Sequence, residues 1–320
     1  MAVITKTKST GVAYSSYTPN TYSDFEMIGK IAQQVIRNVS AKNPLAVFDK
    51  MPINNGDTIE QVVVGLVSEK VYDADGENAL ARLVNDNLAV RYFSDWTRTK
   101  FDYTIDIAKA RKVMQEGKSV NDLTEKMVAS LAESDIYSKF TSIKQLLAWG
   151  ATPDATTSAT PLKNLGIVYG KSGDLDYKSI LKKLKNIVKG MQFVNSDYNT
   201  ASLVRSTEKS DIYIAMPYTL KNAIDVDELA GVFNLDKAEI KDKIIELDTT
   251  DDTIYVVDQN AILVYTRLYE MADQKNADGL FWNYFLHVER LYAISPLFDG
   301  CFFKVSTENE PEQASAGSGN

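Results

Sequence analysis

One segment of the chain has the residue types and order that end a phosphate-binding loop. Gly170, Lys171 and Ser172 follow one another, and in many enzymes this order places a lysine beside nucleotide phosphates. The loop also needs a glycine five positions before Gly170, where this chain has Leu165, and Gly166 comes one residue too late. A cradle of backbone N–H groups depends on that length. We therefore predict a turn before the next helix, and a phosphate-binding enzyme that uses these three residues is the alternative.

Three clusters of acidic residues could hold a hard cation through their carboxylate oxygens. They are Asp73/Asp75/Glu77, Asp225/Asp227/Glu228 and Asp248/Asp251/Asp252. None has the spacing of a calcium-binding loop, because the glycine of the first cluster comes too early. Solvated turns and helix N-termini explain these residues better, since Asp and Glu are favoured in the first turn of a helix. We expect no metal site and no cofactor.

The chain has one histidine, His287, and one cysteine, Cys301. A single histidine removes the commonest general base and metal ligand from almost every site, and a single cysteine excludes an intrachain disulfide. His287 lies in an apolar strand pattern, and Cys301 lies beside Phe302 and Phe303, so we interpret both as core residues. We predict no catalytic, cofactor-binding or metal residues, and hence no enzyme.

The segment 177–191 combines an apolar pattern at helical spacing with many lysines. Its apolar residues recur as one buried face would require. The lysines are Lys178, Lys182, Lys183, Lys185 and Lys189. They could face DNA, but a lysine-rich polar face is more often the solvated side of an amphipathic helix, which is the interpretation that we favour.

Composition indicates an ordinary globular chain. Of 320 residues, 44% are hydrophobic and 24% charged, which is enough apolar material for a sizeable core. The formal net charge of −8 argues against a protein whose main task is to grip nucleic-acid phosphates, although not against one that encloses nucleic acid. No apolar run of about 18 residues occurs, and the start MAVITKTKST lacks the apolar stretch of a signal peptide, so we expect neither a membrane span nor a secretory signal.

The first third of the chain predicts an arm, a helix and a long hairpin. Residues 1–24 are polar without a period, which is typical of an arm that a partner orders. Residues 25–39 have helical spacing, and Pro44 stops the helix. Residues 58–71 and 88–104 alternate and are rich in β-branched or aromatic types, which predicts two long strands. Because a two-stranded ribbon has too little interior to be stable alone, we expect it to rest on a neighbouring subunit.

The rest of the chain predicts two long helices followed by mixed structure. The longer helix should run from Ser119, which begins a reduced capping box with Asp122, to Trp149, and the second over 177–191. A loop of small residues at 151–161 should separate them. Strands are predicted at 211–216, 253–257, 261–269, 279–295 and 302–305, and short helices at 217–223 and 226–233.

Three segments together point to a known family. They are QVIRNVSAKNPLAVFDKMPINNGDTIEQV at 34–62, DVDELAGVFNLD at 225–236 and DGLFWNYFLHV at 278–288. The first has a valine-isoleucine-arginine start, an asparagine-proline-leucine step and a threonine-isoleucine-glutamate strand opening. The third has a glycine, an aromatic pair with tryptophan, an asparagine and further aromatics before histidine-valine. In these residues and their order the chain resembles the major capsid proteins of small short-tailed phages of the phi-twenty-nine type.

The resemblance implies an α+β capsid fold of the Hong Kong 97 type. Its parts would be an N-terminal arm at 1–45, an extended β-hairpin loop with its base at 46–110, a peripheral domain with a long spine helix at 111–199, an axial domain at 200–275, a return strand of the peripheral domain at 276–306, and a disordered tail at 307–320. Some relatives append an immunoglobulin-like surface domain. This chain ends soon after Val305, so we expect that domain to be lacking and shell assembly to be unaffected.

The resemblance also implies a function: a structural subunit that self-assembles into an icosahedral shell around double-stranded DNA. Its partners would be other copies in pentamers and hexamers, a scaffolding protein during assembly, a portal protein, and packaged DNA that is enclosed without sequence-specific binding, with no membrane. It would lie in the virion capsid, and in the host cytoplasm before assembly. A nanocompartment shell protein of the same fold is the structural alternative.

The predicted hairpin offers candidate contacts between subunits. Its apolar candidates for burial are Val62, Val64, Leu66, Phe93, Trp96 and Phe101. Its candidate ionic partners at the rim are Glu69, Lys70, Asp73, Glu77, Arg82 and Arg91.

Overall fold

The computed structural model describes residues 40–54, 56, 58–67, 69, 88–106, 117–155, 158–171, 173–224, 243–249 and 251–309, with side chains of the long helix from residue 125 on. The chain divides into two compact units, which are described separately. Unit 1 holds Met1–Ala41, Lys100–Asp135 and Glu270–His287, and unit 2 holds Lys42–Thr99, Ile136–Tyr269 and Val288–Asn320.

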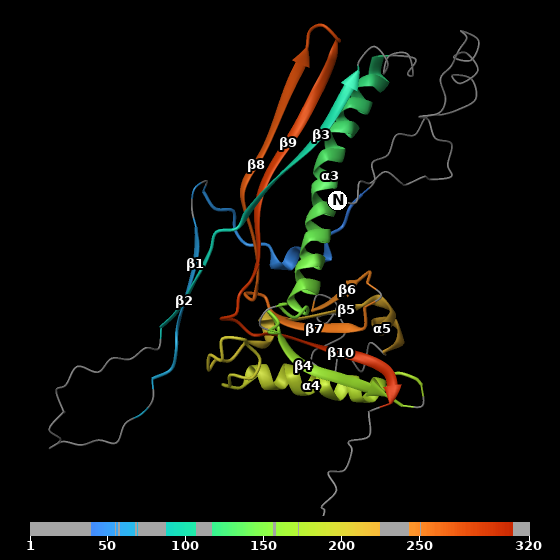
Figure 1. The fold of residues 1–320 in the computed structure, drawn as a ribbon. Coiled ribbons are helices and arrows are strands. Elements are labelled where there is room, and N and C mark those ends of the chain that lie inside the picture. Colours follow the sequence, from blue (N-terminus) through green and yellow to red (C-terminus); the bar gives the residue numbers. More distant parts are fainter. Residues whose placement is uncertain are drawn as a thin grey trace, which may run out of the picture. The chain divides into compact units, whose positions relative to one another are not determined.

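The described elements are named in chain order in Figure 1. They are η2 (Pro44–Phe48), β1 (Ile59–Val64), β2 (Leu88–Phe93), β3 (Trp96–Asp106), α3 (Gly117–Gly150), β4 (Lys163–Gly170), α4 (Tyr177–Gln192), η3 (Lys209–Asp211), β5 (Ile212–Pro217), α5 (Tyr218–Ala223), β6 (Ile244–Leu247), β7 (Thr253–Asp258), β8 (Ile262–Asn276), β9 (Phe281–Ile294) and β10 (Gly300–Asn309).

Unit 2 is built on a five-stranded mixed sheet in the order β4-β10-β7-β5-β6. Strand β4 is parallel to β10 and β6 is parallel to β5, whereas the central strand β7 is antiparallel to both of its neighbours. All six residues of β7 are buried, as expected for a strand covered on both faces. The strands predicted at 211–216, 253–257 and 302–305 are therefore confirmed, and α5 confirms the short helix predicted at 217–223.

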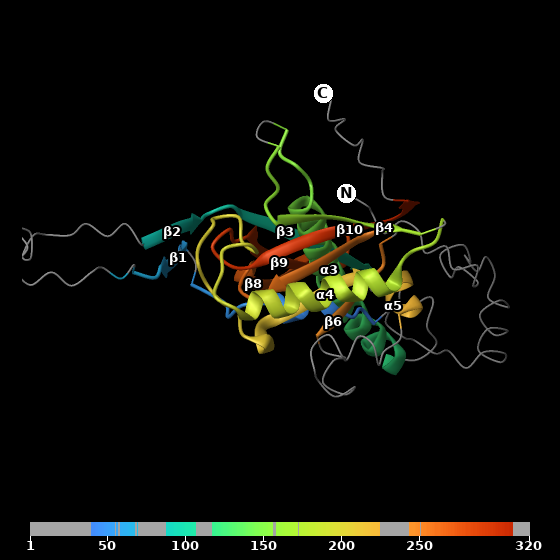
Figure 2. The same cartoon turned by 90° about the horizontal axis from the view of Figure 1, so that it is seen from below.

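The two faces of this sheet bury different apolar clusters. On one face, Ile180, Leu184 and Ile187 of α4 are buried in the same cluster as residues of β5, β7 and β10. On the other face, residues of η2 and of the last turns of α3 are buried with residues of β5, β6, β7 and β10. Figure 2 shows α4 lying along the sheet of this unit. The unit thus has a three-layer arrangement whose core is apolar on both sides of the sheet.

Helix α4 begins at a well-formed N-cap. The carboxylate of Asp176 accepts hydrogen bonds from the Ser179 backbone N–H at 3.2 Å and from its hydroxyl at 2.7 Å, which satisfies an otherwise unpaired donor of the first turn. The buried residues recur at the spacing of one helix face, as the sequence pattern predicted. The helix runs to Gln192, so the prediction of a helix over 177–191 is confirmed.

Helix α3 has 34 residues and confirms the long helix predicted from Ser119 to Trp149. In unit 2 its residues Ile143 and Leu147 are fully buried. It ends at Gly150, where an added Cβ would come within 2.8 Å of side-chain carbons of Leu162 and Ile294. Glycine is therefore required at this position by the close approach of neighbouring side chains.

A second sheet has the order β3-β9-β8, and each of its strands has residues in both units. Strands β8 and β9 are joined by a tight turn in unit 1, in which the Asn276 side-chain oxygen accepts hydrogen bonds from the backbone N–H groups of Asp278 and Gly279. The strand predicted at 279–295 is confirmed, and the strand predicted at 261–269 continues as far as Asn276.

The predicted strand at 88–104 is in fact two strands in different sheets. Strand β2 ends at Phe93 and pairs antiparallel with β1, whereas β3 begins at Trp96 and belongs to the three-stranded sheet. Ser94 and Asp95 separate them. The prediction was wrong because both segments alternate, and alternation does not tell which sheet a residue joins. The described part of the strand predicted at 58–71 is shorter, since β1 ends at Val64.

A turn precedes α4, as predicted, but residues 163–170 just before it form the unpredicted strand β4. The turn is closed by two backbone hydrogen bonds between Lys171 and Asp174, of 2.9 and 3.1 Å. Strand β6 was also not predicted. The helices predicted at 25–39 and 226–233, the arm at 1–24 and the tail after 309 lie outside the described residues.

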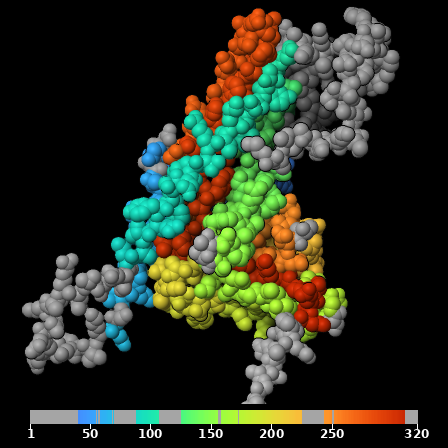
Figure 3. All heavy atoms as spheres, in the orientation of Figure 1, coloured from blue at the N-terminus to red at the C-terminus, as the bar shows by residue number. Residues whose placement is uncertain are grey.

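A buried network of hydrogen bonds and an ion pair links residues 199–207, which follow α4, to the sheet of unit 2. Asp258 and Asp299 are 1% and 2% exposed, and their backbones are joined by a 2.8 Å hydrogen bond. The Arg205 guanidinium donates to Asp258 at 3.2 Å, and the Thr207 hydroxyl donates to Asp299 at 2.7 Å. Asn199 donates to Asp299 at 3.1 Å. Figure 3 shows this segment, coloured yellow, at the surface of the unit.

Candidate subunit interface

Strands β1 and β2 form a ribbon with an apolar face that is open to solvent. Side chains alternate along each strand, and the register places Glu60 opposite Tyr92, Val62 opposite Val90 and Val64 opposite Leu88. All six are exposed, and Val64, Tyr92 and Leu88 are each at least 60% exposed. These six residues are called the ribbon face. Apolar side chains gathered in this way mark an interaction surface more often than a simple solvated surface.

The ribbon face ends in a polar pair. The Tyr92 hydroxyl donates a 2.9 Å hydrogen bond to the Glu60 carboxylate across the two strands. This bond, together with the negative charge of Glu60, raises the pKa of Tyr92 above its ordinary value. The hydrogen bond links the two strands through their side chains at one end of the apolar patch, and both side chains remain exposed.

The opposite face of the ribbon is anchored in unit 2. Ile59 and Phe93, which lie opposite one another in the register, are buried with Leu263 of β8 and Leu291 of β9. The Ser295 hydroxyl also donates a hydrogen bond to the side-chain oxygen of Gln61. One face of the ribbon is therefore held at its root by its own subunit, while the ribbon face is open to a partner.

Trp96 is fixed just beyond the ribbon by a cation. The Arg267 guanidinium lies 4.5 Å from the centre of the Trp96 ring and forms a 2.8 Å ion pair with Glu289. The hydrogen bond of this pair lowers the pKa of Glu289 and raises that of Arg267. The Trp96 ring thus makes a cation–π contact within its own subunit.

The predicted contact residues fall into three groups in the structure. Val62 and Val64 lie on the ribbon face, and Leu66, Glu69 and Arg91 are also exposed. Phe93 is buried and Trp96 half-buried in unit 2, and Phe101 is half-buried in unit 1. Lys70, Asp73, Glu77 and Arg82 lie outside the described residues. The sequence reasoning missed Leu88, Val90 and Tyr92, because only the pairing register shows that they share a face with Val62 and Val64.

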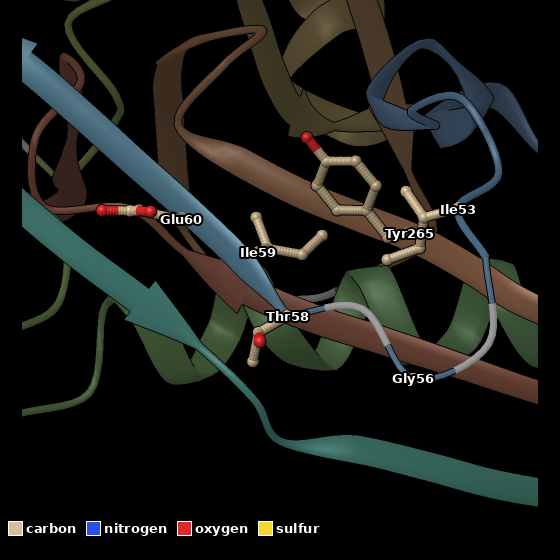
Figure 4. A pocket seen from close by; sticks show the side chains of 6 residues that line it. All are labelled: Ile53, Gly56, Thr58, Ile59, Glu60 and Tyr265. Atoms are coloured by element: carbon tan, nitrogen blue, oxygen red, sulfur yellow. The ribbon is translucent and has the colours of Figure 1, made fainter.

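A shallow open cleft of about 540 Å³ lies at the root of β1, as Figure 4 shows. Its lining is Ile53, Gly56, Thr58, Ile59, Glu60 and Tyr265. The side chains of Ile53 and Tyr265 lie close to Ile59, while that of Glu60 points away from them (Figure 4). Burial raises the pKa of Tyr265. The lining of the cleft has one carboxylate, that of Glu60, and no histidine, cysteine or lysine. The cleft therefore lacks the residue types of a nucleophilic site or of a paired acid and base.

The geometry around Lys171 is not that of a phosphate cradle. Its ammonium group lies 2.7 Å from the Asp176 carboxylate. This hydrogen bond and those from Ser179 lower the pKa of Asp176 to about 2. Gly170 is the last residue of β4, and an added Cβ there would lie 2.2 Å from the Asp174 carbonyl oxygen. The lysine therefore serves the N-cap of α4, which argues against a nucleotide site.

The other candidate chemical groups also lie in structural settings. Within the described residues, no group of three or more histidine, cysteine or acidic side chains is placed to share a metal ion. Asp248 instead pairs with Lys144 at 2.8 Å, and the other two acidic clusters lie outside the described residues. Cys301 is fully buried as predicted, and burial raises its pKa, whereas His287 is only half-buried, beside the Phe285 ring. No described helix is long and apolar enough to span a bilayer.

Known proteins share both sequence and fold with this chain. The family described as Phi29-like phage major capsid protein matches residues 2–304. The major capsid protein of Bacillus phage GA-1 is 25% identical over 276 residues, covering 84% of this chain and 57% of that protein. That of Bacillus phage PZA is 22% identical over 275 residues, covering 84% and 60%. The chain therefore spans less than two thirds of the length of these relatives.

Among solved structures, the capsid structure of Staphylococcus phage Andhra superimposes with a TM-score of 0.71 at 13% identity, covering 87% of this chain and 88% of that one. At this identity the likeness shows the fold. The predicted α+β capsid fold of the Hong Kong 97 type is confirmed.

Proposed function

Because this chain belongs to the Phi29-like phage major capsid protein family, we propose that it is the structural subunit of a phage head. Copies of it assemble into an icosahedral shell that encloses double-stranded DNA. The described residues support a structural role, since their candidate chemical groups serve a helix cap, ion pairs and the core. The function of the molecule is then mechanical and depends on contacts between copies.

The ribbon face is the observation that carries this proposal. Its valines, leucine and tyrosine are exposed, whereas the opposite face is buried at Ile59 and Phe93 and mostly half-buried beyond them. Full burial of a valine or leucine side chain contributes about 1.5–3 kcal/mol, so covering this face with another copy is favourable. A patch of six residues is small beside a stable two-protein interface, which buries upward of about 1,000 Å². A contact of this size is weak alone and strong when a closed lattice repeats it.

The partners follow from the same proposal. The ribbon face contacts another copy, and copies form pentamers and hexamers. A scaffolding protein guides assembly, a portal protein occupies one vertex, and DNA is enclosed without sequence-specific binding. The subunit lies in the host cytoplasm before assembly and in the virion afterwards. We also propose that residues 111–199 and 276–306 form the peripheral domain and residues 200–275 the axial domain.

The double variant V62D/V90D tests this role of the ribbon face. It places two like charges opposite one another on the exposed side of the ribbon. Exposed strand positions tolerate such changes at a cost of about 1 kcal/mol each, so the subunit should remain folded. Burying the charges against a neighbour is strongly unfavourable, so particles should not form. Circular dichroism and thermal unfolding measure the fold, and negative-stain electron microscopy measures assembly.

The matched control is V62I/V90I, which keeps the same two positions apolar and β-branched. This variant should assemble like the natural chain. Normal particle yield from V62D/V90D would overturn the role of the ribbon face. Absence of particles from the natural chain under all assembly conditions, with scaffolding protein present, would overturn the shell function itself.

A further inference from the structure

The exposed lysines of α4 lie on one narrow stripe. At about 100° per residue, positions 178, 182, 185 and 189 fall within about 60° of the helix circumference. Lys178, Lys182, Lys185 and Lys189 are all exposed, whereas the face toward the sheet is apolar and buried. These four residues are called the lysine stripe. Figures 1 and 2 show no other described helix or strand of unit 2 over the outer side of α4.

The rest of the polar arc of α4 carries little charge. It holds Ser179, Asn186 and Gly190, and Gly190 is packed so closely by the Tyr198 hydroxyl that a Cβ would lie 1.9 Å from it. The fifth lysine, Lys183, is turned inward, with its ammonium group 2.6 Å from the Leu165 carbonyl oxygen. The exposed lysines thus occupy one part of the polar arc, and uncharged residues occupy the rest of it.

The charges of the lysine stripe are not neutralised by the described residues. Helix α4 contains no acidic residue, and none of the four lysines has a carboxylate within ion-pair distance in the described part of the chain. Asp176, just before the helix, is already paired with Lys171. Four positive charges in a row, without a carboxylate partner among the described residues, make the surface locally positive in a chain whose net charge is −8.

We propose that the lysine stripe binds the phosphate backbone of double-stranded DNA on the inside of the shell. The inference rests on the proposed function, which supplies enclosed DNA as the polyanion. Eleven residues of helix separate Lys178 from Lys189, a length of about 16 Å, and one DNA strand presents a phosphate about every 3.4 Å of its axis. The stripe therefore spans about five phosphates of one strand.

DNA fits the stripe better than a protein partner does. Between Lys178 and Lys189 no exposed residue of α4 is apolar or aromatic, and the exposed Tyr177, Phe193 and Val194 lie beyond the ends of the stripe. Protein interfaces gain most of their affinity from buried aromatic and apolar anchors. Lysine instead acts on phosphate as a point charge and reads no sequence. The acidic remainder of the chain repels DNA and so keeps this contact weak. The contact depends strongly on salt because each neutralised phosphate releases counterions.

Fluorescence anisotropy with a short labelled DNA duplex tests the inference on the full-length chain. The quadruple variant K178Q/K182Q/K185Q/K189Q should bind the duplex at least tenfold more weakly than the natural chain at about 50 mM salt. The slope of log K against log salt should also fall in magnitude by about 0.9 for each phosphate that the variant no longer neutralises. A second variant, K42Q/K126Q/K275Q/K304Q, removes the same charge from exposed lysines of four other segments. Its affinity should stay within about threefold of the natural value.

Three results would overturn the inference: no duplex binding by the natural chain at low salt, natural binding by the stripe variant, or an equal loss in the control variant. If the stripe variant binds DNA normally but no longer binds an acidic protein that the natural chain binds, the inference is also overturned. The stripe would then be a binding site for that protein. Imaging the natural chain with scaffolding protein present separates the two proposals. If particles form but the chain binds no duplex, the stripe proposal alone is rejected. If the chain binds the duplex but forms no particles under any assembly condition, the shell proposal is rejected.

Discussion

At the scale of single residues, Arg205 is central because it is the cation that faces two buried carboxylates. It is paired with Asp258 at 3.2 Å and lies 3.7 Å from Asp299. Burial raises the pKa of Asp258, and Arg205 opposes that effect. Asp211 adds a further negative charge that raises it. The segment after α4 is thus held by a buried ion pair. Removing either the cation or the carboxylate would leave the other charge buried without its partner, which is costly.

We expect Arg205→Met to destabilise unit 2 by about 3–5 kcal/mol at neutral pH, because it leaves buried negative charge without a partner. The pKa of Asp258 should rise further, so the folded state takes up a proton more readily than the unfolded state. Its stability should therefore increase as pH falls through the raised folded pKa. Urea unfolding at pH 7 and pH 5 measures this. Arg205→Lys keeps the charge, so its free energy of unfolding should fall much less. An equal fall in both variants at both pH values would contradict the prediction.

Lys171→Ala provides a second measurement at this scale. The Asp176 carboxyl has a pKa of about 2 because Lys171 and Ser179 donate to its charged form. Removing the lysine should raise that pKa toward the ordinary aspartate range, because one of these donors is lost. Carboxyl NMR titration measures the change. Neither the natural chain nor Lys171→Ala should bind nucleotide. If the natural chain binds nucleotide and Lys171→Ala does not, the enzyme alternative is favoured instead.

At the scale of elements, sequence periodicity predicted the helices well. Helices α3 and α4 carry apolar residues at steps of three and four over many turns, and their ends agree with the predictions within about two residues. Strands β4 and β6 were missed for two reasons. Strand β4 contains Gly166 and ends at Gly170, which weakens its strand signal, and β6 is a four-residue strand next to a parallel neighbour.

The candidate interface was predictable only in part, because a sequence does not reveal strand pairing. Val62 and Val64 were predicted as contacts, and their alternation put them on one face. Phe93 looked equally suitable, yet its register partner is the buried Ile59, which places it on the inward face. A shift of one residue would exchange the two faces, so burial and register had to be seen together.

Replacing residues 72–87, which lie between β1 and β2 and outside the described residues, with a short Gly-Ser turn tests whether this segment is needed for assembly. Because the ribbon is anchored at its root by Ile59 and Phe93, the shortened subunit should stay soluble and folded. If residues 72–87 supply contacts with other copies, as the predicted hairpin implies, the shortened subunit should no longer close into particles although the ribbon face is intact. Sedimentation and negative-stain imaging measure both outcomes. A normal particle yield would show that the deleted residues are dispensable.

At the scale of the whole molecule, charge and apolar surface act in opposite directions. Copies of net charge −8 repel one another, and this favours soluble subunits before assembly. In our proposal the ribbon face supplies an attraction that is weak in one copy and repeated over the shell. The proposed role of the lysine stripe gives the same acidic molecule a place with affinity for DNA. Assembly and DNA enclosure can then proceed without any strong single contact.

The buried thiol of Cys301 has a consequence for particles that leave a cell. In the proposed shell, a virion would pass from a reducing interior to an oxidising exterior, and each copy of this sequence would bring one sulfhydryl group with it. That group is buried in the core, and burial favours its protonated form, so it is a poor nucleophile toward oxidants or other thiols. We therefore expect Cys301 to form no disulfide between copies, and a reductant should leave the particles unchanged.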